Sequence, residues 1–218
     1  MIADVMRFLD NVLSDFINKA PDQFKDAKYS AERERSVGLG VMGFHSFLQK
    51  KRIPLESVMA KSWNKKIFKQ IDEQVNQASK DLAEERGACP DAAEYGYMER
   101  FSNKTAIAPT ASISIICGGA SPGVEPIAAN SYTHKTLSGS FNVRNRYLEE
   151  ILESHGKNDD ETWSTITTNQ GSVSHLDFLT DLEKDVFKTA FELNQKWIIE
   201  LSGDRTPYIS QAQSVNLF

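Results

Sequence analysis

The stretch that decides the fold, Thr105–Pro126, reads TAIAPTASISIICGGASPGVEP. A short β-prone run, Thr105–Ala108, ends at Pro109, and small or hydroxyl-bearing residues follow. A proline after a strand marks a turn, and Thr110 or Ser112 is suited to cap the start of a short helix. The pattern therefore predicts a strand, a turn and a helix in close succession.

The start of this predicted helix is suited to bind an anion. The first amides of a helix have no intrahelical partner and lie at the positive end of its dipole. Small side chains allow a phosphate to approach those amides, and hydroxyls add donors. An ordinary helix cap is the alternative interpretation, because Ser and Thr cap helices in proteins of every kind. The candidate phosphate-binding residues are Pro109, Thr110, Ala111, Ser112, Ile113 and Ser114.

The composition is that of a globular chain with mixed charges. The 218 residues are 40% hydrophobic and carry a net charge of −5, with acids and bases interspersed. This pattern indicates neither a nucleic-acid partner nor an anionic membrane surface. The longest uncharged apolar run, Ile113–Cys117, is too short to span a bilayer. Asp4, Asp10 and Asp15 interrupt the first twenty residues, which excludes a secretory signal peptide there. We therefore expect a cytoplasmic protein.

The cysteines and histidines predict neither a disulfide framework nor a metal site. The two cysteines, Cys89 and Cys117, are too few for a disulfide scaffold. We interpret both as reduced structural thiols, because a free cysteine behaves as a small buried hydrophobe. The four histidines have no ligand-like spacing to one another or to other ligand residues.

Apolar periodicity predicts a largely helical chain. Thr133–Asn145 is predicted to be a strand or an irregular hairpin, and Pro21–Glu34 a polar linker. Asp159–Glu161 is interpreted as a solvated charge run, and Glu125 as an acid in a surface turn, or as one that orders the phosphate loop from behind. Helices are predicted over residues 5–17, 36–50, 56–86, 145–154 and 181–201.

One glycine motif, GLGVMG (Gly38–Gly43), fits the dinucleotide-binding pattern G-x-G-x-x-G. That fingerprint must follow a buried strand, whereas here it follows the charged run Glu32–Arg35. We therefore reject a dinucleotide site. We predict instead that these glycines lie within the 36–50 helix, where Gly40 and Gly43 allow close helix packing.

Four segments carry a resemblance to a known family. They are RERSVGLGVMGFHSFLQ (Arg33–Gln49), PTASIS with GGASPGVEPI (within Pro109–Ile127), NSYTHKTLSGSFNVRN (Asn130–Asn145) and RTPYISQAQSVNLF (Arg205–Phe218). In this order they resemble the large (alpha) subunit of ribonucleotide reductase in its class I form. The resemblance extends over about the whole chain and is weakest in the first thirty residues and around Gly156–Asp160.

The resemblance implies an α/β, helix-rich fold that forms part of a ten-stranded α/β barrel. Residues 1–218 would be a single partial domain, the C-terminal part of the catalytic barrel. Residues 1–100 would be helical, and residues 101–218 would carry the phosphate loop with the remaining strands and helices. The implied function is that of one part of ribonucleoside-diphosphate reductase, a thiyl-radical oxidoreductase that makes deoxyribonucleotides. This part would supply the loop that binds the diphosphate of the substrate.

The radical centre of the family is not matched in this chain. It lies on a loop of Asn-x-Cys-x-Glu character, and neither Cys89 nor Cys117 has such neighbours. We therefore expect no catalytic residue here and an isolated chain without activity. We also expect no bound cofactor, because class I enzymes take their radical from a separate small subunit. A split large subunit, a truncated product and an expressed fragment are all compatible with this pattern.

The resemblance also implies the partners. They are a ribonucleoside diphosphate substrate, the remainder of the large subunit, the small (beta) radical-generating subunit, and a second copy of the chain in a homodimer. The alternative function is a non-catalytic fragment that binds nucleotide phosphate or docks a partner chain. The missing Asn-x-Cys-x-Glu loop separates the two functions, because it excludes an autonomous reductase.

Overall fold

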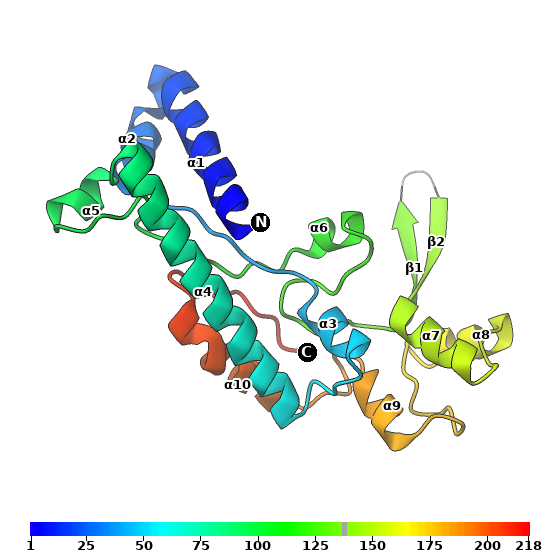
Figure 1. The fold of residues 1–218 in the computed structure, drawn as a ribbon. Coiled ribbons are helices and arrows are strands. Elements are labelled where there is room, and N and C mark those ends of the chain that lie inside the picture. The colour runs from blue at the N-terminus through cyan, green and yellow to red at the C-terminus, as the bar shows by residue number, and fades with distance from the viewer. Residues whose placement is uncertain (137–138) are drawn as a thin grey trace. The chain divides into compact units, whose positions relative to one another are not determined.

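The computed structural model describes residues 1–136 and 139–218. These residues form helices joined by extended segments, together with one antiparallel hairpin (Figure 1). The chain divides into two compact units. The first unit comprises Met1–Gly40, Asn64–Ala108 and Ser202–Ser214, and the second comprises Val41–Trp63, Pro109–Leu201 and Val215–Phe218.

The helices and strands follow one another along the chain in this order: α1 (Ile2–Lys19), the 3-10 turn η1 (Asp22–Phe24), α2 (Lys25–Glu34), α3 (Phe44–Lys50), α4 (Val58–Arg86), α5 (Pro90–Glu94), α6 (Ala111–Ile116), β1 (Ser131–Thr136), β2 (Gly139–Arg144), α7 (Arg146–Ser154), α8 (Asp160–Thr168), α9 (Asp181–Val186), α10 (Gln195–Arg205) and the 3-10 turn η2 (Thr206–Tyr208).

The core of the first unit lies between α1 and the part of α4 that belongs to this unit. Both helices were predicted from their apolar periodicity, and both predictions are confirmed. Gly87 ends α4 with a positive φ of 88°, and its amide donates to the carbonyl of Ala83. Within the described residues, no helix is long and apolar enough to cross a membrane. The buried apolar residues of this core are Met6, Val37, Val75, Ala78, Leu82 and Phe101.

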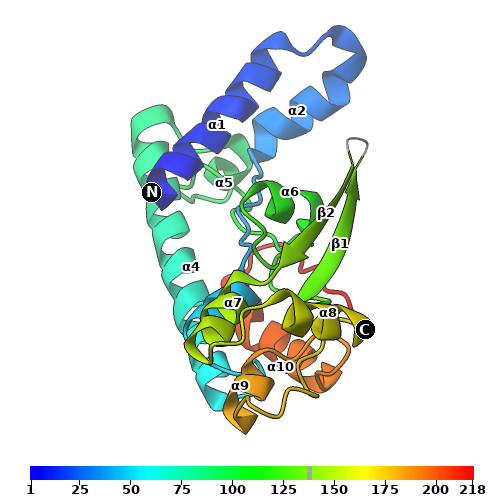
Figure 2. The same cartoon turned by 90° about the vertical axis from the view of Figure 1, so that its right-hand side faces the viewer.

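The predicted polar linker, Pro21–Glu34, is wrong, because most of it is helical. After η1, residues 25–34 form α2, which runs back alongside α1 (Figure 2). The sequence KDAKYSAERE is rich in strong helix formers but has no buried residue. A helix without an apolar face gives no periodicity to detect, which explains the error.

The predicted helix over residues 36–50 is wrong in its first half. Residues 36–43 are not helical, Leu39 forms a parallel bridge with Thr105, and α3 begins only at Phe44. Gly40 makes the close approach possible. A Cβ at this position would lie 2.6 Å from the carbonyl oxygen of Ala106. The glycine therefore serves the approach of two extended segments and not helix packing.

A third extended segment lies on the other side of the predicted strand Thr105–Ala108. Ile107 forms a parallel bridge with Gln213, supported by main-chain bonds from Ile107 to Ala212 and from Ser214 to Ile107. The extended conformation of Thr105–Ala108 is thus confirmed at these bridges. The fold is helix-rich, and within the described residues the named strands are β1 and β2 alone, so a ten-stranded barrel is not seen.

The main core of the second unit is built by α7, α8, α9 and the turns between them. The prediction of a helix over residues 145–154 is confirmed, and Asn145 caps α7 by accepting from the amide of Tyr147 at 3.1 Å. Asp159 caps α8 in the same way, so the charge run there starts a helix. The buried apolar residues of this core are Leu148, Ile151, Leu152, Trp163, Ile166, Val173, Leu176, Leu179, Val186 and Phe187.

The single helix predicted over residues 181–201 is wrong, because turns separate α9 from α10. The amide of Ala190 donates to the carbonyl of Ile127 at 2.8 Å, and the amide of Thr189 donates to the Glu192 carboxylate at 2.8 Å. These bonds replace intrahelical ones. Phe191, which lies between the two helices, is 68% exposed.

The hairpin prediction for Thr133–Asn145 is confirmed by β1 and β2. The two strands pair antiparallel, with Ser131 opposite Arg144 and Thr136 opposite Gly139. Leu137 and Ser138, at the centre of the predicted hairpin, lie outside the described residues.

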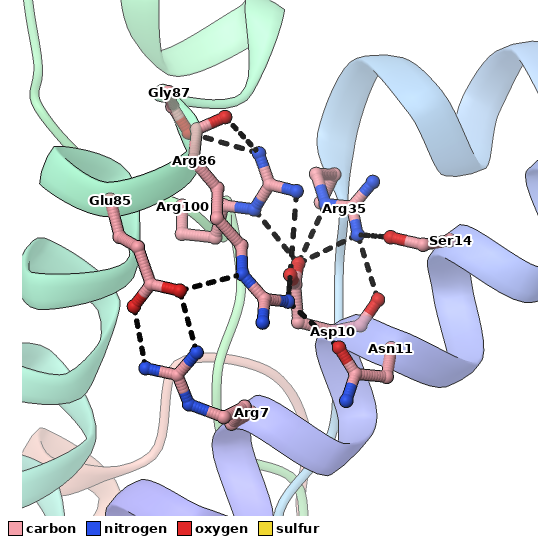
Figure 3. A network of polar contacts seen from close by, with 9 residues as sticks. All are labelled: Arg7, Asp10, Asn11, Ser14, Arg35, Glu85, Arg86, Gly87 and Arg100. Atoms are coloured by element: carbon pink, nitrogen blue, oxygen red, sulfur yellow. Dashed lines mark hydrogen bonds and ion pairs between the residues drawn. The ribbon is translucent and has the colours of Figure 1, made fainter.

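A buried carboxylate, Asp10 of α1, joins three arginines in the first unit (Figure 3). Its Oδ1 accepts from Arg35 at 2.6 Å and from Arg100 at 2.8 Å, and its Oδ2 accepts from Arg86 at 2.8 Å. Burial raises the pKa of the Asp10 carboxyl, but the bonds from the arginines outweigh it and the pKa falls below 3.8. Arg100 also donates to the carbonyl of Gly87, so the cluster ties α1 to the end of α4.

Candidate functional site

The predicted phosphate loop lies in the second unit, where Thr110 immediately precedes α6. Thr110 has a φ of 54°, in the left-handed region. This conformation is strained for a β-branched residue and persists only where its surroundings hold it. The loop is therefore held in a specific conformation by contacts outside it.

The hydroxyl of Thr110 contacts a second segment and not the helix that it precedes. Thr110 occupies the predicted N-cap position, but its side chain makes no capping hydrogen bond. Instead its Oγ1 accepts from the amide of Gly123 at 2.7 Å. A hydroxyl that accepts from Gly123 still has its own proton to donate elsewhere.

Three consecutive amides at the start of α6 precede its first intrahelical hydrogen bond. That bond runs from the amide of Ser114 to the carbonyl of Thr110 at 2.9 Å. Ala111, Ser112 and Ile113 come before it, and all three are exposed. Ser114, in contrast, is buried, and its hydroxyl donates to the Ala111 carbonyl at 3.0 Å. The donors that lie on exposed residues of the loop are therefore the amides of residues 111–113 and the Ser112 hydroxyl.

Gly43 and the first residues of α3 hold the segment that follows α6. The amide of Gly43 donates to the carbonyl of Ser121 at 2.8 Å, and the amide of Phe44 donates to the carbonyl of Gly123 at 3.3 Å. Ser46 and Ser121 exchange a further pair of hydrogen bonds. Because Gly123 in turn donates to Thr110, α3 and the predicted phosphate loop are joined by a continuous path of hydrogen bonds.

Glu125 is buried, so the interpretation of this acid as part of a surface turn is wrong. Its side chain is 3% exposed, and both carboxylate oxygens accept from the side chain of Asn216 at 3.1 Å. The amide of Asn216 donates to the same carboxylate at 2.9 Å. Glu125 thus holds Asn216, and both residues belong to the second unit. Its suggested role in ordering the phosphate loop stays a prediction.

His45 of α3 is a buried acceptor in this region. Its Nδ1 accepts from the amide of Ile127 at 3.1 Å, and its side chain is 1% exposed. Burial lowers the pKa of His45 from 6.5 to about 4. The neutral imidazole is therefore the form that the folded chain requires at neutral pH.

The pKa of His45 predicts that acid destabilises the second unit. Between pH 6.5 and 4 the unfolded chain binds one proton more at this residue than the folded chain does. The free energy of unfolding therefore decreases as the pH is lowered through this range, by about 3 kcal/mol in total. His45→Gln, whose amide oxygen can still accept from Ile127, is expected to flatten this dependence. Denaturant unfolding at several pH values measures it, and the exposed His175→Gln is the matched control. A wild-type slope retained in His45→Gln would contradict the assignment.

The two cysteines differ in burial. Neither is disulfide-bonded, as predicted, and Cys89 is buried. Cys117, however, is exposed at the end of α6, so its interpretation as a buried structural thiol is wrong. In the described part of the chain, His, Cys, Asp and Glu side chains form no group of three that could hold a metal ion.

This difference in burial predicts two rates of alkylation. In the native chain without reductant, Cys117 is expected to react at least about a hundredfold faster than Cys89, which becomes accessible only through local opening. Mass spectrometry over time measures both rates, and denatured chain provides the control in which they converge. Equal native rates, or a chain that takes up no label, would contradict the structure.

The candidate loop was predictable as a segment of the sequence, whereas the residues that contact it from other segments were not. Ser46, Ser121 and His45 carry no sequence signal for this role, because each is ordinary in its own segment. Gly43 was noticed, but only as a packing glycine in a helix. Its φ of 81° and its place before α3 show that it begins that helix.

Comparison with known proteins supplies the family. The family model of the ribonucleotide reductase barrel domain matches residues 1–99 and 90–218, and thus the whole chain. The chain belongs to the ribonucleotide reductase barrel-domain family. Among relatives, the ribonucleoside-diphosphate reductase large subunit of Invertebrate iridescent virus 6 is 49% identical over 100% of this chain and 23% of its own length. The corresponding subunit of Invertebrate iridescent virus 3 is 46% identical over 99% of this chain and 34% of its own length.

A solved structure of the same family has the same fold. The alpha subunit of the class Id ribonucleotide reductase of Actinobacillus ureae superposes with a TM-score of 0.92 at 39% identity, covering 100% of this chain and 40% of that subunit. The chain therefore has an α/β fold of the ribonucleotide reductase type. It spans well under half of the length of each of these three reductase subunits.

Proposed function

We propose that this chain is one part of a ribonucleoside-diphosphate reductase large subunit and supplies the loop that holds the substrate diphosphate. The matched relatives bear the name of that subunit. The observation that carries the assignment of the loop is the row of three amides at residues 111–113, which are exposed residues and whose amides no intrahelical bond uses. The six residues Pro109 to Ser114 form this proposed binding segment.

The donors of the loop suit a diphosphate. Amides at the start of a helix attract anions, and bonds to a charged acceptor are stronger than neutral ones. The Ser112 hydroxyl adds a donor beside the amides. Thr110 accepts from Gly123 and can direct its proton toward the same phosphate. Ala111 leaves room for an anion to approach the main chain.

Holding the diphosphate would orient the ribose for reaction. A substrate fixed at one end loses much of its rotational freedom, which lowers the barrier to reaction at the other end. The reacting thiol would belong to another segment of the subunit, since neither cysteine of this chain lies in an Asn-x-Cys-x-Glu context. The radical would come from the small subunit. We accordingly assign this chain binding and orientation and no catalytic residue.

The proposal includes the assembly in which this chain would act. The extended segments around Leu39, Thr105 and Gln213 would be part of a ten-stranded barrel wall that the rest of the large subunit completes. Both compact units would then belong to one partial domain over residues 1–218. The proposed partners are the remainder of the large subunit, the small subunit and a second copy in a homodimer, all in the cytoplasm.

A chimaera tests the proposed function. This chain would replace the matching segment in the large subunit of Invertebrate iridescent virus 6. The match covers 100% of this chain. With its small subunit and a reductant, the chimaera is expected to form deoxyribonucleotides. A chimaera that folds and binds the small subunit but gives no product would contradict the proposal.

A further inference from the structure

A reciprocal pair of serine contacts joins α3 to the segment after α6. The Oγ of Ser121 accepts from the amide of Ser46 at 3.1 Å, and the Oγ of Ser46 accepts from the amide of Ser121 at 2.9 Å. Both side chains are buried, with exposed fractions of 7% for Ser46 and 0% for Ser121. Two buried hydroxyls are thus committed to two main-chain amides.

The pair has the geometry of a capping box divided between two segments. In a capping box, the N-cap side chain accepts from the third amide of the helix, and the third side chain accepts from the N-cap amide. Ser46 is the third residue of α3, but the N-cap residue is Gly43, which has no side chain. Ser121 takes over both roles, because its side chain accepts from the amide of Ser46 and its amide donates to the side chain of Ser46. The start of α3 therefore depends on a residue 75 positions away in the sequence.

This divided cap determines where the segment from Ser121 to Gly123 lies. The carbonyls of Ser121 and Gly123 accept from the amides of Gly43 and Phe44, so the segment is held at both ends. The amide of Gly123 then donates to Thr110, the strained residue before α6. The hydrogen bonds of Ser46, Ser121, Gly123 and Thr110 therefore form one continuous path from α3 to the loop.

We propose that Ser121 and Ser46 are positioning residues for the Pro109–Ser114 loop and act on it through Gly123 and Thr110. The inference rests on the proposed function of that loop. The two serines do not contact the diphosphate. They fix the donor that holds Thr110 in its left-handed conformation and thereby fix the direction of the first amides of α6.

The test uses the full 218-residue chain and inorganic pyrophosphate as the probe, with binding followed by calorimetry. Losing a cap of this kind is expected to weaken pyrophosphate binding about fivefold in Ser121→Ala. Ser46→Ala is expected to have a similar effect. Thr110→Val removes the acceptor of the Gly123 bond and is expected to weaken binding as well. In the Thr110→Val background, the further change Ser121→Ala is expected to have no additional effect.

The matched control is Ser131→Ala. Ser131 is also a buried serine of the second unit, but its hydroxyl bonds to Thr167 and leads to no part of the loop. Ser131→Ala thus removes a buried hydroxyl that is not part of the hydrogen-bond path to the loop. Its pyrophosphate affinity is expected to match that of the wild type. Circular dichroism confirms that each variant is folded before it is titrated.

The outcomes separate the two proposals. If the wild-type chain does not bind pyrophosphate, the proposed function of the loop fails, and the positioning role fails with it. If Thr110→Val weakens binding but Ser121→Ala binds like the wild type, the positioning role alone is overturned. Equal losses from Ser121→Ala in the wild-type and Thr110→Val backgrounds would also overturn it, because the effect would not pass through Thr110.

Discussion

Replacement of Asp10 by alanine is expected to lower the free energy of unfolding of the first unit by about 3–5 kcal/mol. The carboxylate is fully buried and holds Arg35, Arg86 and Arg100 in one cluster. Without it, Arg35 and Arg100 lose their carboxylate partner, and Arg86 keeps only the carboxylate of Glu85. Denaturant unfolding measured with a probe in α1 gives the loss directly.

The matched control for Asp10 is Glu85→Ala. Glu85 also forms a two-bond pair with an arginine, Arg7, at 2.7 and 2.6 Å, but both side chains are nearly half exposed. An exposed pair contributes at most about 1 kcal/mol. Equal losses in the two variants would show that burial of Asp10 does not determine the contribution of the cluster.

The double variant Thr110→Glu/Ser112→Glu is expected to weaken binding of a ribonucleoside diphosphate by about 2–4 kcal/mol, or roughly 30- to 1,000-fold. The change removes two hydroxyl donors and places two negative charges beside the proposed diphosphate. The KM for ADP in the active chimaera, with direct binding measurements beside it, gives the size of the effect.

The control for this double variant adds the same charges elsewhere in the second unit. Thr133→Glu/Ser140→Glu places two glutamates on exposed positions of the hairpin. Its substrate affinity is expected to stay within about twofold of the wild type, because neither position belongs to the Pro109–Ser114 segment and salt screens charges exposed to solvent. If the loop variant and the hairpin variant behave alike, the loop does not bind the diphosphate.

Helices with a clear apolar face were predictable from sequence, and those without one were not. Apolar residues at spacings of three and four, Leu9 and Leu13 among them, identified α1, and the long apolar stripe of α4 identified that helix within two residues of its start. For α2 the apolar face is missing, so the same signal could not arise. The break between α9 and α10 depends on a main-chain bond from Ala190 to Ile127, which periodicity does not reveal.

The candidate site was predictable only as a segment. Its strand, turn and short helix follow from the proline, the small residues and the hydroxyls of Thr105–Ser114. The conformation of that segment depends on contacts between residues distant in sequence, as the bond from Gly123 to Thr110 and the Ser46–Ser121 pair illustrate. The burial of Asp10 and Glu125 was missed for the same reason: their partners lie far away along the chain.

Deoxyribonucleotide formation by defined mixtures tests most directly whether this chain supplies one part of a ribonucleotide reductase large subunit. The complete mixture contains this chain, a large-subunit polypeptide that carries the segments of the relatives that this chain does not match, the small subunit, a reductant and a ribonucleoside diphosphate. We predict product from the complete mixture and none when either large-subunit polypeptide is left out. Turnover by this chain with no other large-subunit polypeptide present would contradict the assignment of the radical centre to another segment.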